Sequence, residues 1–384
     1  MIQQDHLQVF DLTLKTQSPL FVGSGRKIGK REYIYSPNQG CVKILNMELF
    51  FDYMLRHDLV RQFEKFMLSS SNSSLLDFWT RDCHLAEDWL EHPKLMGDKP
   101  LVQYRLAVTE DVAGYNGTKE IHQFQRDAYG RAYIPGSSLK GALRTAWLVH
   151  LLLHETPVSD KKRTLEAFEV NHDYVFPEGS YANKLRSGAA ADDILDSIFR
   201  GAQVSDSAPI DNDKLILTGR TLISPLSAAR VEDFDGDAKD LPLYQECVRP
   251  GETIRFRLTL DQSILNRHIH PITKDALLEA IAEFSRFYQD AFLSHFPQGH
   301  PVANIPDTPH LILGGGTGFL SKTVGYPYLK DDYAAALKWT QRILQTQHGR
   351  HEADISLGVS PHRARYVTYA GKRYPAGFCE VNIL

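Results

Sequence analysis

The elements predicted for this chain follow one order in each half, a strand, a loop, a helix and a strand, and this order restricts the fold more than any other feature. Alternating apolar residues predict a strand over residues 7–14, and a helical pattern follows over residues 138–154. Apolar residues at i+3 and i+4 spacing predict a second helix over residues 273–293, and a strand-like stretch ends the chain. The order is typical of the β-α-β-β-α-β motif. We therefore expect an α+β fold with two domains, residues 1–205 and 206–384.

Composition and charge exclude several classes of protein. Hydrophobic residues make up 42% of the 384 residues, enough for a sizeable core. No run of about 18 uncharged apolar residues is present, and the N-terminus lacks the apolar stretch of a signal peptide. The four cysteines form no C-x-x-C pair, which argues against a zinc knuckle or a disulfide framework. The net charge of -4 argues against a free-standing non-specific nucleic-acid binder. We expect a cytoplasmic protein with no membrane segment, metal or cofactor.

The stretch YIPGSSLKGALRTAW, residues 133–147, predicts an anion site at the start of a helix. Pro135 and Gly136 favour a turn, and Ser137 or Ser138 is expected to cap the helix. The other amide groups of the first turn then point outward with the positive end of the helix dipole, which suits a phosphate. Cations four residues apart share one helix face. The predicted site consists of Gly136, Ser137, Ser138, Lys140 and Arg144.

Two other interpretations of this stretch are possible. Gly136 and Gly141 have the spacing of the first half of a P-loop, but Ala142 and Leu143 stand where that motif needs lysine and serine or threonine, which argues against an ATPase. An ordinary capped helix that binds nothing also explains the serines.

Two further glycine-rich loops carry adjacent hydroxyl groups and cations. Small residues let backbone amides and cations approach a polyanion closely. The first loop consists of Gly23, Ser24, Gly25, Arg26 and Lys27. The second consists of Gly314, Gly315, Gly316, Thr317, Gly318, Phe319 and Lys322. Each taken alone is consistent with a flexible hairpin, but three such segments in one chain favour a sugar-phosphate backbone as the ligand.

Together these motifs carry a family resemblance. The stretches SPLFVGSG, IPGSSLKGALR and GGGTGF resemble the RAMP superfamily of CRISPR proteins. Their order, with an acidic stretch at residues 231–240 and the ending GKRYPAGFCEVNIL, is similar to the fifth Csm subunit of type III-A effector complexes. The resemblance covers residues 7–384.

The resemblance implies a fold and a function. It implies two ferredoxin-like (RRM-like) RAMP domains with inserted loops and helices, which bind CRISPR RNA (crRNA). It implies a subunit without catalytic residues that caps the filament at the crRNA 3′ end and aids crRNA maturation. The implied partners are the adjacent backbone RAMP subunit, the small helical subunit and, indirectly, the target RNA, and recruitment of a host nuclease is left open.

The resemblance also implies which residues bind RNA. It carries over the three glycine segments described above. It adds Phe124 and Arg126, in a long loop expected over residues 109–131, as part of a thumb-like insertion. The chain lacks the aromatic run with which RRM domains stack bases on their sheet.

Two functions from other classes remain as alternatives. The first is a metal-independent endoribonuclease for CRISPR precursor RNA, with His122 as general base. The other histidines, among them His268, His270 and His351, form no H-E-x-x-H motif. The acidic stretch lacks the spacing of a calcium loop. The second alternative is a small-anion or nucleotide binder.

Overall fold

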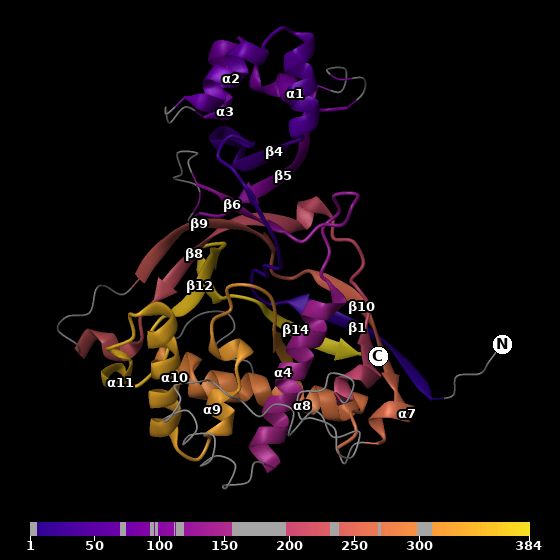
Figure 1. Ribbon diagram of the computed structural model, residues 1–384, viewed down its shortest axis with the longest axis vertical. Coiled ribbons are helices and arrows are strands. Elements are labelled where there is room, and N and C mark those ends of the chain that lie inside the picture. The colour runs from indigo at the N-terminus through magenta and orange to yellow at the C-terminus, as the bar shows by residue number, and fades with distance from the viewer. Residues whose placement is uncertain are drawn as a thin grey trace.

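The protein is a mixed helix-and-sheet structure with two curled sheets (Figure 1). The computed structural model describes residues 6–69, 74–92, 96, 99–110, 112, 119–155, 197–230, 238–267, 270–297 and 309–384. The acidic residues 231–237 and His268 lie outside this part of the chain. None of the described helices has both the length and the apolar character needed to cross a lipid bilayer.

The first sheet has five antiparallel strands and collects them from the whole chain. Its order is β11 (His310–Ile312), β14 (Phe378–Ile383), β1 (Leu7–Thr16), β10 (Thr253–Asp261) and β7 (Ala202–Val204). Strand β1 lies between β10 and β14, so Leu12 pairs with both Phe256 and Ile383. Helices α4 (Gly136–Glu155) and α8 (Lys274–Ala291) pack against this sheet and against each other. Their apolar faces close the main core, in which Leu12, Trp147 and Ile281 are buried.

The second sheet has nine strands and curves over the first one. Its path is β2 (Gly23–Ile28), β6 (Ile121–Phe124), β9 (Ala238–Val248), β8 (Leu215–Ile223), β5 (Val102–Val108), β4 (Cys41–Leu45) and β3 (Tyr33–Ser36). Strand β12 (Ala364–Tyr369) pairs with β8 and with β13 (Lys372–Pro375). The pairs β5–β8 and β6–β9 are parallel, and the other pairs are antiparallel. Figure 1 shows β9 arching above the first sheet.

A helical lobe inserted between β4 and β5 stands at one end of the molecule (Figure 1). It contains α1 (Met47–Arg56), α2 (Val60–Leu68), α3 (Leu75–Asp77), a π-turn (Phe78–Asp82) and a 3-10 turn (Glu87–Glu91). It has a core of its own, with Phe50, Phe63, Phe78 and Trp79 at its centre. The lobe is therefore a separately packed insertion.

Further helices complete the end of the molecule opposite the lobe (Figure 1). They are α7 (Gln262–Leu265), α9 (Gly325–Tyr328), α10 (Tyr333–His348) and α11 (Asp354–Leu357). Single 3-10 turns span Pro37–Gln39, Ile198–Gly201, Asn212–Lys214, Leu226–Arg230, Leu293–His295 and Leu320–Lys322.

Two expectations about organisation differ from the structure. Each sheet takes strands from both sides of residue 205, so the division predicted there does not separate the sheets. The loop expected over residues 109–131 is wrong in part, because Ile121–Phe124 form β6. This strand was missed because it is short and three of its four residues are buried, which leaves no alternation to detect.

A buried ion pair ties the second sheet together beneath β6. The Glu246 side chain is fully buried, and the Arg126 side chain is 7% exposed. Glu246 Oε2 lies 3.2 Å from Arg126 Nη2 and accepts a hydrogen bond of 3.0 Å from the Phe124 amide. The Tyr104 hydroxyl donates to Glu246 Oε1 at 2.6 Å, and the Arg126 guanidinium lies 3.8 Å above the Tyr104 ring. Burial raises the pKa of the Glu246 carboxyl, and Arg126 and the hydrogen bonds oppose that shift.

We predict that Arg126→Ala lowers the free energy of unfolding by about 3–5 kcal/mol, because it leaves the Glu246 carboxyl buried without its cation. Urea denaturation measures this loss. The double variant Arg126→Met, Glu246→Gln is expected to recover part of the stability, because the amide carbonyl introduced at position 246 still accepts hydrogen bonds but carries no charge. A loss below about 1 kcal/mol for Arg126→Ala contradicts the structural role of the pair.

Candidate nucleic-acid interface

The three glycine-rich segments predicted from the sequence meet at one groove. We call this cavity, of about 600 Å³, the glycine groove. The residues of the predicted segments that line it are Gly23, Gly25, Ser137, Ser138, Gly314, Gly315 and Lys322. The remaining lining includes Phe21, His122, Gly141 and Thr145. Segments nearly 300 residues apart in the chain are therefore brought to one surface.

The start of α4 differs from the expected capped helix. The helix begins at Gly136, so Ser137 and Ser138 lie within its first turn and do not precede it. Gly136 is needed because a Cβ there would lie 2.3 Å from the carbonyl oxygen of Val204. Its amide donates to Asp206 Oδ1 at 2.8 Å, and the Ser138 amide donates to the Pro135 carbonyl at 3.0 Å. A protein carboxylate thus already uses part of the predicted dipole site, while the two serines line the groove.

The segment Gly23–Lys27 is a bulged strand and not a free loop. In β2 the pairing with β6 shifts register between Gly23 and Lys27, and Gly25 takes a φ of 83° in the bulge. The Ser24 hydroxyl donates to the Gln123 carbonyl at 3.3 Å and accepts from the Arg26 amide at 3.1 Å. The bulge therefore holds a row of exposed backbone and cations in a fixed shape.

The cations of this bulge form exposed ion pairs. Lys27 Nζ lies 2.9 Å from Glu120 Oε2, and Arg26 Nη2 lies 3.6 Å from Glu32 Oε1. Exposed pairs of this kind are worth little energy, so a polyanion can compete for these cations.

The segment Gly314–Lys322 is held against Phe21, two residues before the segment Gly23–Lys27. The Gly315 amide donates to the Phe21 carbonyl at 2.7 Å, and a Cβ on Gly314 would lie 2.1 Å from that same oxygen. Gly314, Gly316 and Gly318 have φ values of 91°, 80° and 100°, which favour glycine. Thr317 is buried and accepts a hydrogen bond of 2.8 Å from Ser321. Phe319 packs partly buried against the main core.

Cations of the predicted segments and of the neighbouring strands repel one another, and among them Lys322 lines the groove. Burial lowers the pKa of His122, and the charges of Lys27 and Arg220 lower it further. Burial and then Arg144 lower the pKa of Lys140. Lys322 is an exposed residue whose ammonium is partly desolvated. This desolvation lowers its pKa, and the charges of Arg365 and Arg220 lower it further. Polyanion binding would relieve this repulsion.

Phe124 and Arg126 do not contribute to the groove surface. Phe124 is fully buried, and Arg126 serves the internal ion pair with Glu246. Arg126 also donates to the Gly130 carbonyl at 2.9 Å and to Asn212 Oδ1 at 2.8 Å. Neither predicted RNA contact therefore lies on the groove. Through Glu246, Arg126 instead supports β6, the strand that carries the groove residue His122.

Arg220 and Arg365 were not identified from the sequence, because the strands that carry them contain no recognisable motif. Arg220 lies on β8, and its guanidinium packs against Gly316. Arg365 lies on β12 and lines a second cavity of about 510 Å³, which we call the basic pocket. The basic pocket is lined in part by Lys239, Gly318, Phe319, Arg350, His351, His362, Arg363 and Arg365. The segment Gly314–Lys322 therefore separates two cavities that both carry cations.

The chain also resembles known proteins in sequence. A model of the RAMP superfamily matches residues 13–283. The chain belongs to the RAMP superfamily. A relative from Streptococcus thermophilus, "CRISPR system Cms protein Csm5", is 30% identical over 321 residues, 83% of this chain and 80% of the relative. The protein of the same name from Mycobacterium tuberculosis is 25% identical over 98% of both chains. These relatives make this RAMP protein Csm5-like.

Solved structures share its fold. A chain of a Csm–crRNA–target RNA ternary complex of a type III-A CRISPR–Cas system superposes with a TM-score of 0.66 at 18% identity, over 97% of this chain and 100% of that one. The crystal structure of T. onnurineus Csm5 gives a TM-score of 0.60 at 17% identity, over 96% of this chain and 99% of that one.

We predict that Gly314→Ala destabilises the protein far more than Gly25→Ala. Both glycines have a positive φ, so both substitutions carry a backbone cost of about 1–2 kcal/mol. Only Gly314 also meets a backbone oxygen, because a Cβ on Gly25 would lie in open space. Thermal denaturation of the two variants checks this, and equal losses would show that the contact between Gly314 and Phe21 contributes nothing.

Proposed function

We propose that this RAMP protein is a non-catalytic crRNA-binding subunit of a type III-A Csm complex, which caps the filament at the crRNA 3′ end and aids crRNA maturation. The observation that carries the proposal is the convergence of three glycine segments on the glycine groove. The groove offers backbone, serine hydroxyls and the Lys322 ammonium, which are groups that bind phosphates without reading bases.

An extended polyanion fits this surface better than a small anion or nucleotide. The glycine groove and the basic pocket lie on either side of the segment Gly314–Lys322, and repulsion between Lys322, Arg365 and Arg220 extends from one to the other. A single phosphate occupies one such cavity, whereas a strand of several nucleotides neutralises cations in both.

The relatives support the partners that we propose. A solved structure with the same fold belongs to a complex that contains crRNA and target RNA. For this chain we propose crRNA as the direct ligand, with the adjacent backbone RAMP subunit and the small helical subunit as neighbours, in the cytoplasm. Contact with target RNA is indirect in this proposal.

The strand order supports a finer assignment of the fold. In chain order, β1, α4, β7, β10, α8 and β14 follow the β-α-β-β-α-β motif, and their sheet order is β14, β1, β10, β7. We propose that they form one ferredoxin-like unit, which draws on both predicted domains.

The endoribonuclease remains the second candidate because of the position of His122. It lines the glycine groove, and its lowered pKa keeps the imidazole neutral and able to accept a proton at pH 7. Acid–base cleavage also needs a group that donates a proton to the leaving oxygen. Among the described residues that line the groove, Lys322 is the other titratable one. The groove therefore supports binding better than cleavage.

The proposal predicts that Lys140→Ala with Arg144→Ala weakens binding of crRNA by a few kcal/mol or less at moderate salt. Each lost phosphate contact reduces the slope of log K against log salt by about 0.7 for a single strand. Fluorescence anisotropy at several salt concentrations measures both. The matched control is Arg61→Ala with Lys65→Ala, which removes two exposed cations four residues apart on α2 in the helical lobe. Equal losses in the two double variants would place the RNA elsewhere.

A second prediction concerns His122 and pH. Bound phosphate raises the depressed pKa of His122, so the complex takes up a proton and binding strengthens as pH falls from 8 to 6. The gain is limited to about tenfold for each unit by which the pKa rises. His122→Gln is expected to abolish this part of the pH dependence while RNA stays intact in EDTA. Site-specific cleavage by the unaltered protein that His122→Gln abolishes would favour the endoribonuclease.

A further inference from the structure

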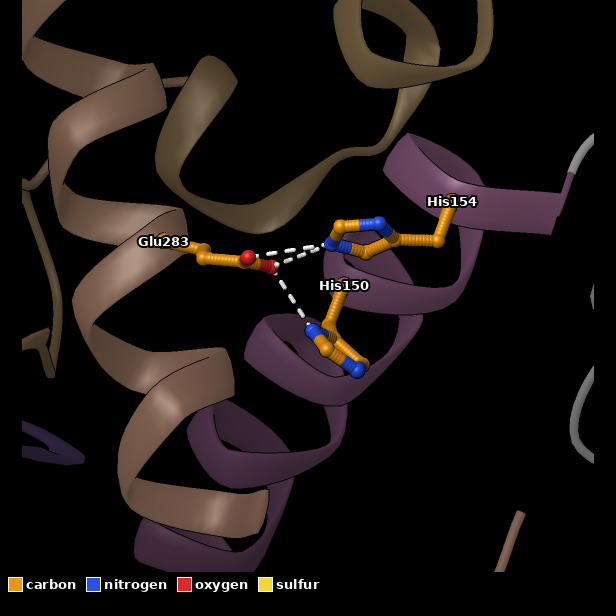
Figure 2. A group of neighbouring side chains, drawn as sticks. All are labelled: His150, His154 and Glu283. Atoms are coloured by element: carbon orange, nitrogen blue, oxygen red, sulfur yellow. Dashed lines mark hydrogen bonds and ion pairs between the residues drawn. The ribbon is translucent and has the colours of Figure 1, made fainter.

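Helices α4 and α8 bring together three metal-binding side chains away from the glycine groove (Figure 2). His150 and His154 lie four residues apart on one face of α4, and Glu283 faces them from α8. His150 Nδ1 lies 2.7 Å from Glu283 Oε2, and His154 Nε2 lies 3.0 Å from Glu283 Oε1. One ligand atom from each residue can be chosen so that all three lie within 4.8 Å of one another.

We propose that His150, His154 and Glu283 bind one divalent transition-metal ion, with zinc as the ion that the donors fit best. Two imidazole nitrogens and one carboxylate oxygen form one of the common three-residue zinc sets, with a fourth position for water. Zinc bonds of about 2.0–2.2 Å in a tetrahedron place the donor atoms about 3.3 Å apart. Each histidine nitrogen lies slightly closer than this to Glu283, and all three donors lie within 4.8 Å of one another, so small side-chain rotations suffice to admit the ion.

The helices hold the donors in place before any ion binds. His150 and Glu283 are 19% and 16% exposed, and the His150 ring lies 5.4 Å from the ring of Trp147, which is itself in the main core. On α8, Ile281 and Phe284 flank Glu283 and are buried in the same core. His154 is 54% exposed, which leaves solvent access to the fourth position. Preorganised donors of this kind favour tight binding.

The other histidine cluster of the described residues fits a cation less well. His351 and His362 both bond through Nδ1 to Asp354, which is fully buried and also accepts from Ser360. This cluster borders the basic pocket, where Arg350 and Arg365 repel a cation. It is the internal control for the proposed site.

The proposed ion has a structural role. The N-terminal turn of α4 lines the glycine groove, and His150 lies about 20 Å farther along the same helix. An ion that joins α4 to α8 fixes the helix that presents Ser137 and Ser138. This inference does not depend on RNA binding, so its failure leaves the proposed function standing.

The test uses the full chain, stripped of metal by EDTA and dialysed, then titrated with zinc sulfate by isothermal calorimetry. We expect one zinc per chain and a melting temperature that rises with zinc concentration, because the ion binds the folded state. His154→Ala and Glu283→Gln are each expected to raise Kd at least tenfold. The control His351→Ala, His362→Ala is expected to keep the full stoichiometry.

Two outcomes would overturn the site. The first is a folded chain that takes up no zinc, and the second is uptake that His154→Ala and Glu283→Gln leave unchanged. Circular dichroism of each variant confirms folding, and His154→Ala alters a largely exposed side chain whose loss the fold tolerates. If His150, His154 and Glu283 only hydrogen-bond to one another and bind no ion, these variants change the melting temperature equally with and without zinc.

Discussion

The close approach of two backbone segments, at Phe21 and at Gly314–Gly315, determines the surface that we propose as the RNA site. The Gly315 amide bonds to the Phe21 carbonyl at 2.7 Å, and no side chain fits at Gly314. A second pair of bonds extends the join, from the Gly377 amide to the Pro19 carbonyl at 3.1 Å and from the Leu313 amide to the Gly377 carbonyl at 2.8 Å. The first and last parts of the chain are thereby held together before any ligand is present, and the start of α4 completes the groove between them.

Positive charge gathers near the groove in a protein whose net charge is -4. Lys322 lines a surface made largely of glycine backbone and serine hydroxyls, the charges of Lys27 and Arg220 act on the groove residue His122, and Lys140 lies on α4, whose first turn lines the groove. Such a surface suits phosphates irrespective of base, which is what the proposed crRNA-binding role requires. Beneath it, the buried pair of Arg126 and Glu246 stiffens β6, so the rigidity of the groove has an ionic as well as a backbone origin.

Local signals predicted much of the fold and of the site. Alternation and helical spacing predicted β1, α4, α8 and β14, and the glycine motifs identified all three segments of the groove. The pairing of strands from opposite ends of the chain was not predictable, because hydrophobic periodicity carries no information about partners. The setting of Phe124 was not predictable for the same reason, because its backbone amide bonds to Glu246, more than a hundred residues away.

The expected start of α4 shows a different limit. A serine before an apolar pattern is a good N-cap signal, yet the helix begins earlier, because Gly136 packs on the Val204 carbonyl and Asp206 binds its amide. The proposed metal site could likewise be recognised only in part from the sequence. The i,i+4 spacing of His150 and His154 was visible in the sequence, whereas Glu283 joins them through the packing of α4 on α8.

The most direct measurement of the central claim is photocrosslinking in an assembled complex whose crRNA carries 4-thiouridine near its 3′ end. Mass spectrometry then identifies the crosslinked peptides of this chain. We expect crosslinks in residues 21–27, 133–147 and 312–322, which line or border the glycine groove. Crosslinks confined to the helical lobe of α1–α3, with those three stretches unlabelled, would contradict the claim that the groove holds the RNA.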